Sequence, residues 1–172
     1  MLNAVRSRAG LGVMGGDEGF TLVEQMLVVG IIGVLLAIGI PTLLGAKSRA
    51  NDRAVQSSLR TGMVTEKTYF SDQNRYSNDV APGGQLKKVE QSLTYLAGPV
   101  PATGAMPMAV YVEVTSSSAA TNDIVCLTGR SASGGFFGMR DAANGAGGTK
   151  FSKGSTPPPA GCDAADYTLS SF

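Results

Sequence analysis

The sequence predicts an α+β protein in which one long N-terminal α-helix packs on a small antiparallel β-sheet head. An almost uninterrupted apolar run over residues 20–46 continues into a segment of helical periodicity that ends near Tyr76. After Pro107, short segments instead alternate apolar and polar residues, as strands do. At 172 residues the chain has room for one membrane helix and one modest globular domain.

The apolar run is long enough to cross a membrane, and it contains a single ionisable side chain, Glu24. About 20 apolar residues span a hydrocarbon core about 30 Å thick as a helix. A carboxylate inside such a helix costs roughly 2.5–3.5 kcal/mol, so a functional group with a designated cationic partner is the default interpretation. The alternative is that Glu24 reaches the membrane interface from near the helix end.

Residues 1–19 form a short polar leader ahead of the apolar run. Arg6 and Arg8 favour an N-terminus that stays in the cytoplasm, with the head exported, by the positive-inside rule. The order is the reverse of a secretory signal peptide, in which the apolar core precedes the cleavage site. Cleavage at the end of this leader would therefore leave the membrane helix on the mature protein.

Cleavage before Phe20 would also supply the cation that Glu24 lacks. It would create an α-amino group four residues from the carboxylate, at the same membrane depth in a neighbouring copy. A buried charge with an oppositely charged partner is tolerated where a lone charge is not.

Beyond the apolar run the pattern is amphipathic from Leu43 to Phe70, which predicts a continuation of the same helix. The helix should end within residues 71–75, where Asp, Gln and Asn are weak helix formers. Residues 86–96 fit either a short helix or a loop. Gly83-Gly84 and Pro99-Val100-Pro101 mark turns.

Four segments carry strand patterns and predict an antiparallel meander whose apolar face packs on the exported half of the helix. A Gly-rich turn at residues 144–148 would join the last two of these segments. The predicted strands cover residues 109–114, 123–128, 136–140 and 149–152.

The two cysteines, Cys126 and Cys162, both lie in the part predicted to be exported. A disulfide is the natural outcome in an oxidising compartment, and it would stabilise the head by roughly 3–4 kcal/mol in the chain-entropy model. The alternative is a pair of buried free thiols.

Composition argues against catalysis and against cofactor or metal binding. The absence of His removes the commonest general base and metal ligand, and no Gly-rich loop carries the Gly-Lys-Ser/Thr ending of a phosphate site. Asp163 and Asp166 alone fall short of the oxygen ligands that calcium needs. The net charge of +1 and the isolated Lys87-Lys88 pair indicate no nucleic-acid partner.

The segment Gly19-Phe20-Thr21-Leu22-Val23-Glu24, ahead of an apolar helix, resembles the processing site of type IV prepilins and their pseudopilin relatives. Leader, motif, apolar run and Pro41 stand in the order found in that family, and a looser resemblance reaches about Tyr76. The short leader and the Phe that follows Gly19 resemble the type IVa class. The acidic Asp17-Glu18 pair departs from the pattern, because the family usually has basic residues there.

The resemblance implies cleavage between Gly19 and Phe20 by a prepilin peptidase, followed by N-methylation of Phe20. It also implies that Glu24 serves extraction from the membrane and registration of subunits, opposite the Phe20 amine of another copy. Gly33 and Pro41 would bound a segment that melts in the assembled filament. The alternative for the glycines Gly30, Gly33 and Gly39 is close helix packing.

By the same resemblance, the chain divides into a leader (1–19), a transmembrane and assembly helix (20–46), its amphipathic half (47–76), an αβ-loop (77–106) and a β-sheet head (107–172). The head would include a C-terminal region bounded by the disulfide. A basic collar of Lys47, Arg49 and Arg53 would contact anionic lipid, acidic groups of neighbouring subunits, or solvent alone.

The function implied is that of the major structural subunit of a type IV pilus, used for adhesion, motility or DNA uptake. The expected partners are further copies in a helical homopolymer, the prepilin peptidase, the assembly platform with its motor ATPases, and membrane lipid before assembly. The precursor would lie in the cytoplasmic membrane, and the assembled filament outside the cell. One alternative is a pseudopilin or minor pilin of a secretion or competence system. Another is a single-pass anchored binding domain that never polymerises.

Overall fold

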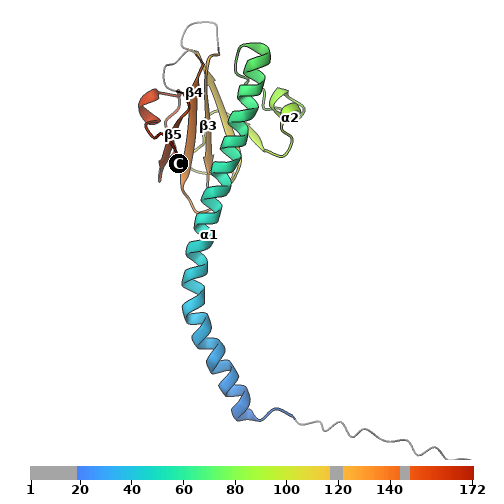
Figure 1. Ribbon diagram of the computed structural model, residues 1–172, viewed down its shortest axis with the longest axis vertical. Helices are drawn as coiled ribbons and strands as arrows, with labels where there is room; N and C mark the ends of the chain where they lie inside the picture. The colour runs from blue at the N-terminus through green and yellow to red at the C-terminus, as the bar shows by residue number, and fades with distance from the viewer. Residues whose placement is uncertain (1–18, 117–121, 144–147) are drawn as a thin grey trace, which may run out of the picture. The chain divides into compact units, whose positions relative to one another are not determined.

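The computed structural model of the chain describes residues 19–116, 122–143 and 148–172. The chain divides into two compact units, Met1–Thr42 and Leu43–Phe172. The first unit contributes the beginning of one long helix, α1 (Leu22–Gln73), and the second contains the remainder of α1 and all other elements. Figure 1 shows these elements in chain order. The expected long N-terminal helix and α+β class are confirmed.

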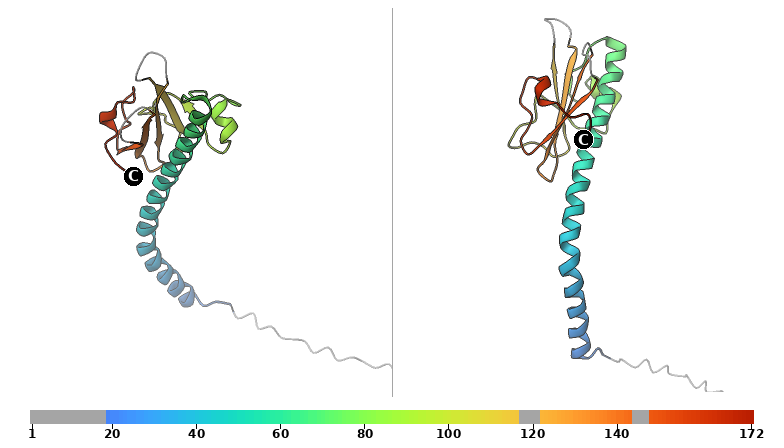
Figure 2. Two further views of the ribbon diagram at one scale, coloured as in Figure 1. Left: turned by 45° about the horizontal axis from the view of Figure 1, so that its top comes forward. Right: turned by 60° about the vertical axis from the view of Figure 1, so that its left-hand side comes forward.

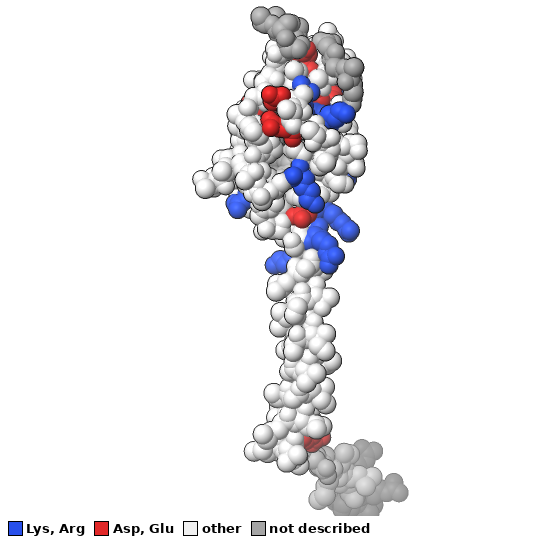
Figure 3. Space-filling model, turned by 90° about the vertical axis from the view of Figure 1, so that its left-hand side faces the viewer, with Lys and Arg blue, Asp and Glu red and all other residues white. Residues whose placement is uncertain are grey.

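The part of α1 in the first unit carries an uncovered apolar surface. Within α1 an 18-residue window has a mean hydropathy of 2.7 with none of it buried, so the helix is long and apolar enough to cross a membrane. The drawn face of this segment shows one acidic side chain and is otherwise uncharged in the space-filling view (Figure 3). Exposing an apolar helix segment of this length to water is unfavourable, so we expect lipid or other apolar surfaces to cover it.

The C-terminal end of α1 lies where the sequence predicts it. The helix ends at Gln73, and Asn74 follows with a φ of 53° in the left-handed region, where Asn is tolerated better than most residues. The Asn74 amide donates to the Phe70 carbonyl oxygen at 2.7 Å, which satisfies one carbonyl of the last turn.

The second unit contains a five-stranded sheet in the order β1-β2-β3-β4-β5. Strands β2 to β5 form the predicted antiparallel meander, and each lies within two residues of its expected bounds. The last turn, at residues 144–147, lies outside the described residues. The strands are β1 (Tyr95–Ala97), β2 (Val110–Thr115), β3 (Ile124–Arg130), β4 (Phe136–Ala142) and β5 (Lys150–Gly154).

The expectation of a purely antiparallel sheet is wrong at one edge, because β1 pairs with β2 in parallel. Three residues are too few to show a strand pattern in the sequence, and residues 98–109 supply the long return that a parallel pair needs. The segment left open as helix or loop contains a one-turn helix, α2 (Gln85–Val89), followed by β1.

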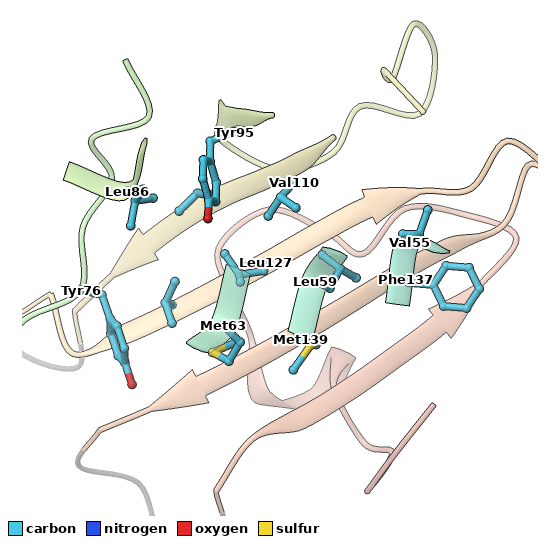
Figure 4. Close-up of a cluster of buried hydrophobic side chains, with 12 residues drawn as sticks. Val55, Leu59, Met63, Tyr76, Leu86, Tyr95, Val110, Leu127, Phe137 and Met139 are labelled. Carbon is cyan, nitrogen blue, oxygen red and sulfur yellow. The ribbon is translucent and has the colours of Figure 1, made fainter. Parts of the chain in front are cut away.

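One face of the sheet packs on the second half of α1, as both views in Figure 2 show. Val55, Leu59 and Met63 recur at four-residue spacing and project from one helix face into the core (Figure 4). The helix approaches closely at Gly62, where a methyl group would lie 3.2 Å from the Leu127 side chain. The facing sheet residues are Val110, Val112, Val125, Leu127, Phe137 and Met139.

The opposite face of the sheet is covered by the C-terminal segment. The disulfide joins Cys126 of β3 to Cys162, with their Cα atoms 5.8 Å apart, and Tyr167 is buried beside it. Gly138 of β4 makes room for this segment, because a methyl group there would lie 2.8 Å from the Tyr167 ring. The expected disulfide is present in the head.

The C-terminal segment also protects the edge of the sheet. Leu169 exchanges backbone hydrogen bonds with Phe151 of β5, both at 3.0 Å, which pairs part of an otherwise open edge strand. The Phe172 ring then packs edge-on against Phe137 and Phe151 on the α1 side, with centroids 5.6 and 4.9 Å away. The segment therefore contacts both faces of the sheet.

A polar cluster joins α1, β4 and the loop after α1. Tyr76 donates a hydrogen bond of 2.5 Å to Asp141, and Lys67 forms an ion pair with the same carboxylate at 3.0 Å. Burial acts to raise the pKa of Asp141, but hydrogen bonds from Tyr76, Thr149 and Lys67 outweigh it and leave this pKa lowered.

Glu66 of α1 is fully buried, and no cationic side chain among the described residues forms an ion pair with it. One carboxyl oxygen accepts the Ser77 amide at 3.0 Å, while the other has no hydrogen-bond partner among the described residues. The Tyr95 hydroxyl is also buried, next to the Thr65 side chain. Burial raises the pKa of Glu66 to about 8, against a smaller lowering by the Ser77 amide, so this carboxyl is neutral at pH 7.

The raised pKa predicts that the head loses stability as pH increases. The folded state binds the Glu66 proton more tightly than the unfolded chain, whose pKa is 4.5. The stabilisation is therefore complete below pH 4.5 and is lost as pH rises towards about 8, by up to about 5 kcal/mol. Glu66→Gln should remove this loss.

The measurement is thermal or denaturant unfolding of the wild type and the Gln variant between pH 5 and 9. Equal pH dependence in the two proteins would show that Glu66 does not titrate in this range. Asp72→Asn is the matched control, since it neutralises an exposed carboxyl of the same helix and leaves Glu66 in place.

Candidate functional site: an uncovered apolar helix with a capped N-terminus

The predicted processing motif lies at the start of α1. Gly19 and Phe20 precede the helix and are exposed, and the Phe20 side chain is 77 % exposed. Thr21 occupies the N-cap position, where its hydroxyl oxygen accepts the Glu24 amide at 3.2 Å. The peptide bond between Gly19 and Phe20 therefore lies outside the helical hydrogen-bond ladder, where an enzyme can reach its backbone.

The helix cap at Thr21 was missed by the sequence reasoning above, although the sequence contains its signal. Thr followed three residues later by Glu is a capping-box pattern, which satisfies free amides at a helix N-terminus. Glu24 also lies in the first turn of α1, where a carboxylate interacts favourably with the helix dipole. This gives Glu24 a local stabilising role in addition to any partner in another copy.

The structure leaves Glu24 available for such a partner. It is exposed, and none of the described residues forms an ion pair with it. The backbone nitrogen of Phe20 is a neutral amide in the uncleaved chain. A single unprocessed chain therefore contains the anion of the predicted pair but not its cation.

The apolar segment offers one continuous surface around the helix. All residues from Gly19 to Ala46 are exposed, including large side chains such as Leu22 and Ile38 at 75 % and 71 %. Methyl groups at Gly30, Gly33 and Gly39 would meet nothing within 4 Å. These glycines create shallow sites at which another helix can approach closely.

Pro41 lies inside α1, and the helix of the single chain is continuous through it. Pro lacks the amide that would bond the Ala37 carbonyl, which weakens the helix at this point. The Thr42 hydroxyl donates to the Ile38 carbonyl oxygen at 3.0 Å in the same turn.

The remaining predicted residues lie in the head. Cys126 and Cys162 are joined, as described above. Asp163 caps the 3-10 helix η1 (Ala164–Asp166) by accepting the Ala165 amide at 3.1 Å. Among the described residues there is no group of three or more His, Cys, Asp or Glu side chains placed to hold a metal ion.

Comparison with known proteins identifies relatives of part of this chain. It is 39 % identical over 62 residues to the type IV major pilin protein PilA of Myxococcus xanthus, which is 36 % of this chain and 28 % of that protein. It is 40 % identical over 68 residues to the type IV wide pilus major component PilA4 of Thermus thermophilus, which is 40 % of this chain and 52 % of that protein.

The chain is type IV pilin-like. It is also 36 % identical over 60 residues to the type II secretion system core protein G of Aeromonas hydrophila, 35 % of this chain and 42 % of that protein. The pilin-like chain thus matches about a quarter to a half of the length of these relatives. No protein-family model and no solved structure matches it.

Proposed function

We propose that this pilin-like chain is the precursor of the major structural subunit of a type IV pilus. The observation that carries the proposal is the helix surface from Phe20 onward, which no part of the described chain covers and which begins with the processing motif. Similarity to two proteins named as major pilus components supports it. The role is structural, and no catalytic step is assigned to the chain.

Assembly moves the apolar helix from membrane lipid to a site among the helices of other copies. Lipid tails are as apolar as Leu and Ile side chains, so leaving the membrane gains no hydrophobic free energy by itself. The gain comes from close packing of helices outside the segment that is proposed to melt, as at Gly30, and from pairing the Glu24 carboxylate of one copy with the Phe20 amine of another. The charge pair also favours one register over others.

The head is proposed to lie on the outer side of the cytoplasmic membrane. The Cys126–Cys162 disulfide supports this orientation, because such bonds persist in oxidising compartments. Arg6 and Arg8 favour a cytoplasmic N-terminus. The prepilin peptidase, an assembly platform and motor ATPases are the proposed partners, with the membrane holding the precursor.

A second candidate is a pseudopilin or minor pilin. Similarity to the type II secretion system core protein G favours it, over fewer matched residues than the pilus components. The two functions differ in abundance, since a major pilin forms most of a sheared filament. A membrane-anchored domain that never polymerises would leave the leader in place.

The deciding experiment is mass spectrometry of material sheared from the cell surface. The proposal expects abundant filaments of a chain that begins at N-methylated Phe20. Detection of only the uncleaved chain in membranes would overturn it, and cleaved chain in trace amounts within filaments of another protein would favour the second candidate.

Glu24→Ala should abolish or cripple filament growth while processing and membrane insertion continue, because the pairing anion is lost and the apolar helix is intact. Cell-surface filament yield and the mature mass are the measurements. Thr21→Ala separates this role from capping. It removes the N-cap at a cost of about 1 kcal/mol but leaves the carboxylate, so filaments should persist. Equal loss in the two variants would mean that Glu24 acts through the cap alone.

The segment between Gly33 and Pro41 is proposed to melt in the filament, since its glycines and proline weaken the helix by up to about 3 kcal/mol at a single position. Pro41→Ala should keep this segment helical and make filaments less extensible. Electron cryomicroscopy of wild-type and variant filaments is the measurement, with Gly45→Ala as a control elsewhere in α1. Continuous helix across the segment in wild-type filaments would refute the melting.

A further inference from the structure

One flank of α1 in the head carries three exposed arginines, Arg49, Arg53 and Arg60, here named the basic stripe. Their spacings of four and seven residues correspond to one and two helical turns, so the three lie in a row. The row is about 16 Å long along the helix axis.

The residues that the structure describes do not neutralise the basic stripe. In the described parts of the chain, none of its members forms an ion pair with an acidic side chain. Asp52 lies among them in sequence, but its carboxylate accepts a short hydrogen bond from the Ser133 hydroxyl in the turn between β3 and β4. Arg60 instead lies 5.6 Å from the centroid of the Phe172 ring, which orders its position.

An acidic patch lies elsewhere on the head and is formed by Glu113, Asp163 and Asp166. Glu113 accepts the Gly161 amide at 2.7 Å, which holds β2 next to the segment that carries the two aspartates. After burial, Glu113 and Asp166 are the groups that raise the pKa of the Tyr167 phenol, so both lie near it. Arg140 of β4 opposes them, and Lys150 of β5 lies opposite Arg140 in the register, so the three acidic groups share this face with two basic ones.

The two charged surfaces lie on different faces of the head. The helix that carries the basic stripe packs on the sheet face formed by Val110 and Leu127. Glu113 alternates with these residues along the strands and shares the other face with Cys126, which lies opposite it in the register. On the face drawn in Figure 3, acidic side chains cluster in the upper part of the head with some basic ones beside them, and further basic side chains gather lower on the head.

The proposed filament is an open assembly in which each copy contacts others through more than one surface. Head-to-tail assembly joins two different surfaces of the same molecule, so these surfaces must complement each other. We propose that the basic stripe of one copy docks against the acidic patch of a second copy. This contact rests on the proposed function and adds a second determinant of register to the pairing of Glu24 with Phe20.

Anionic lipid is the competing occupant of the basic stripe, and two observations favour a second copy. The stripe extends farther along the helix than the headgroup layer, which is about 5–7 Å thick in each leaflet. A lipid surface also leaves the acidic patch without a counterpart. Exposed ion pairs are individually weak and screened by salt, so the contact sets orientation and assembly rate more than total affinity.

The test reverses the charges in cells that express the full chain. Arg53→Glu with Arg60→Glu should lower the yield of sheared filaments at least about tenfold, with the membrane pool unchanged. Lys87→Glu with Lys88→Glu makes the same charge change on α2 and should have little effect. Combining the reversed arginines with Asp163→Lys and Asp166→Lys should restore filaments.

The outcomes separate this inference from the function on which it rests. Absence of wild-type filaments would overturn both, whereas normal filaments from the arginine variant would overturn the interface alone. Loss of the membrane pool in that variant would assign the stripe to lipid. If the lysine variants fail to fold, Asp163→Asn with Asp166→Asn is the second test, because it keeps a side-chain acceptor at the η1 cap. This neutral pair should also lower the filament yield. Unchanged yield in this neutral pair would also overturn the interface.

Discussion

The uncovered apolar surface of α1 is the constraint on which the rest of the molecule depends. A helix that is apolar all round must be buried in lipid or against other helices, and the described chain covers none of it. Under the proposed function, Glu24, the N-cap at Thr21 and the glycines belong to a helix that exchanges lipid for neighbouring helices. A monomer in water would leave this apolar surface exposed to solvent.

The second half of the same helix has one face buried in the head and other faces exposed. One face, with Leu59 at its centre, provides the core for the sheet, while arginines occupy a flank. The C-terminal segment compensates for the small size of this core. It crosses the far face, is fixed by the disulfide and pairs with the edge strand β5. One short segment thus covers the far face, pairs with one edge of the sheet and reaches the α1 side through Phe172.

Burial of Glu66 shows that the head tolerates a polar group where the fold requires it. The carboxyl bonds the Ser77 amide at the point where the chain leaves α1, and this fixes the start of the following loop. Its neutral form avoids a buried charge. The Asp141 carboxylate of β4 also connects to α1 and to the loop after it. It stays charged because Lys67 forms an ion pair with it and Tyr76 donates a hydrogen bond to it.

The sequence by itself determined the elements whose signals are local: the apolar helix, its end near Asn74, the four strands of the meander and the motif around Glu24. It also limited the disulfide to one pairing, since only two cysteines exist. The tertiary structure alone decided the parallel pairing of β1, the path of the C-terminal segment, the burial of Glu66 and the faces on which opposite charges lie. Helical and strand periodicities report which face of an element is buried. Which distant element covers that face depends on non-local packing, which no single segment encodes.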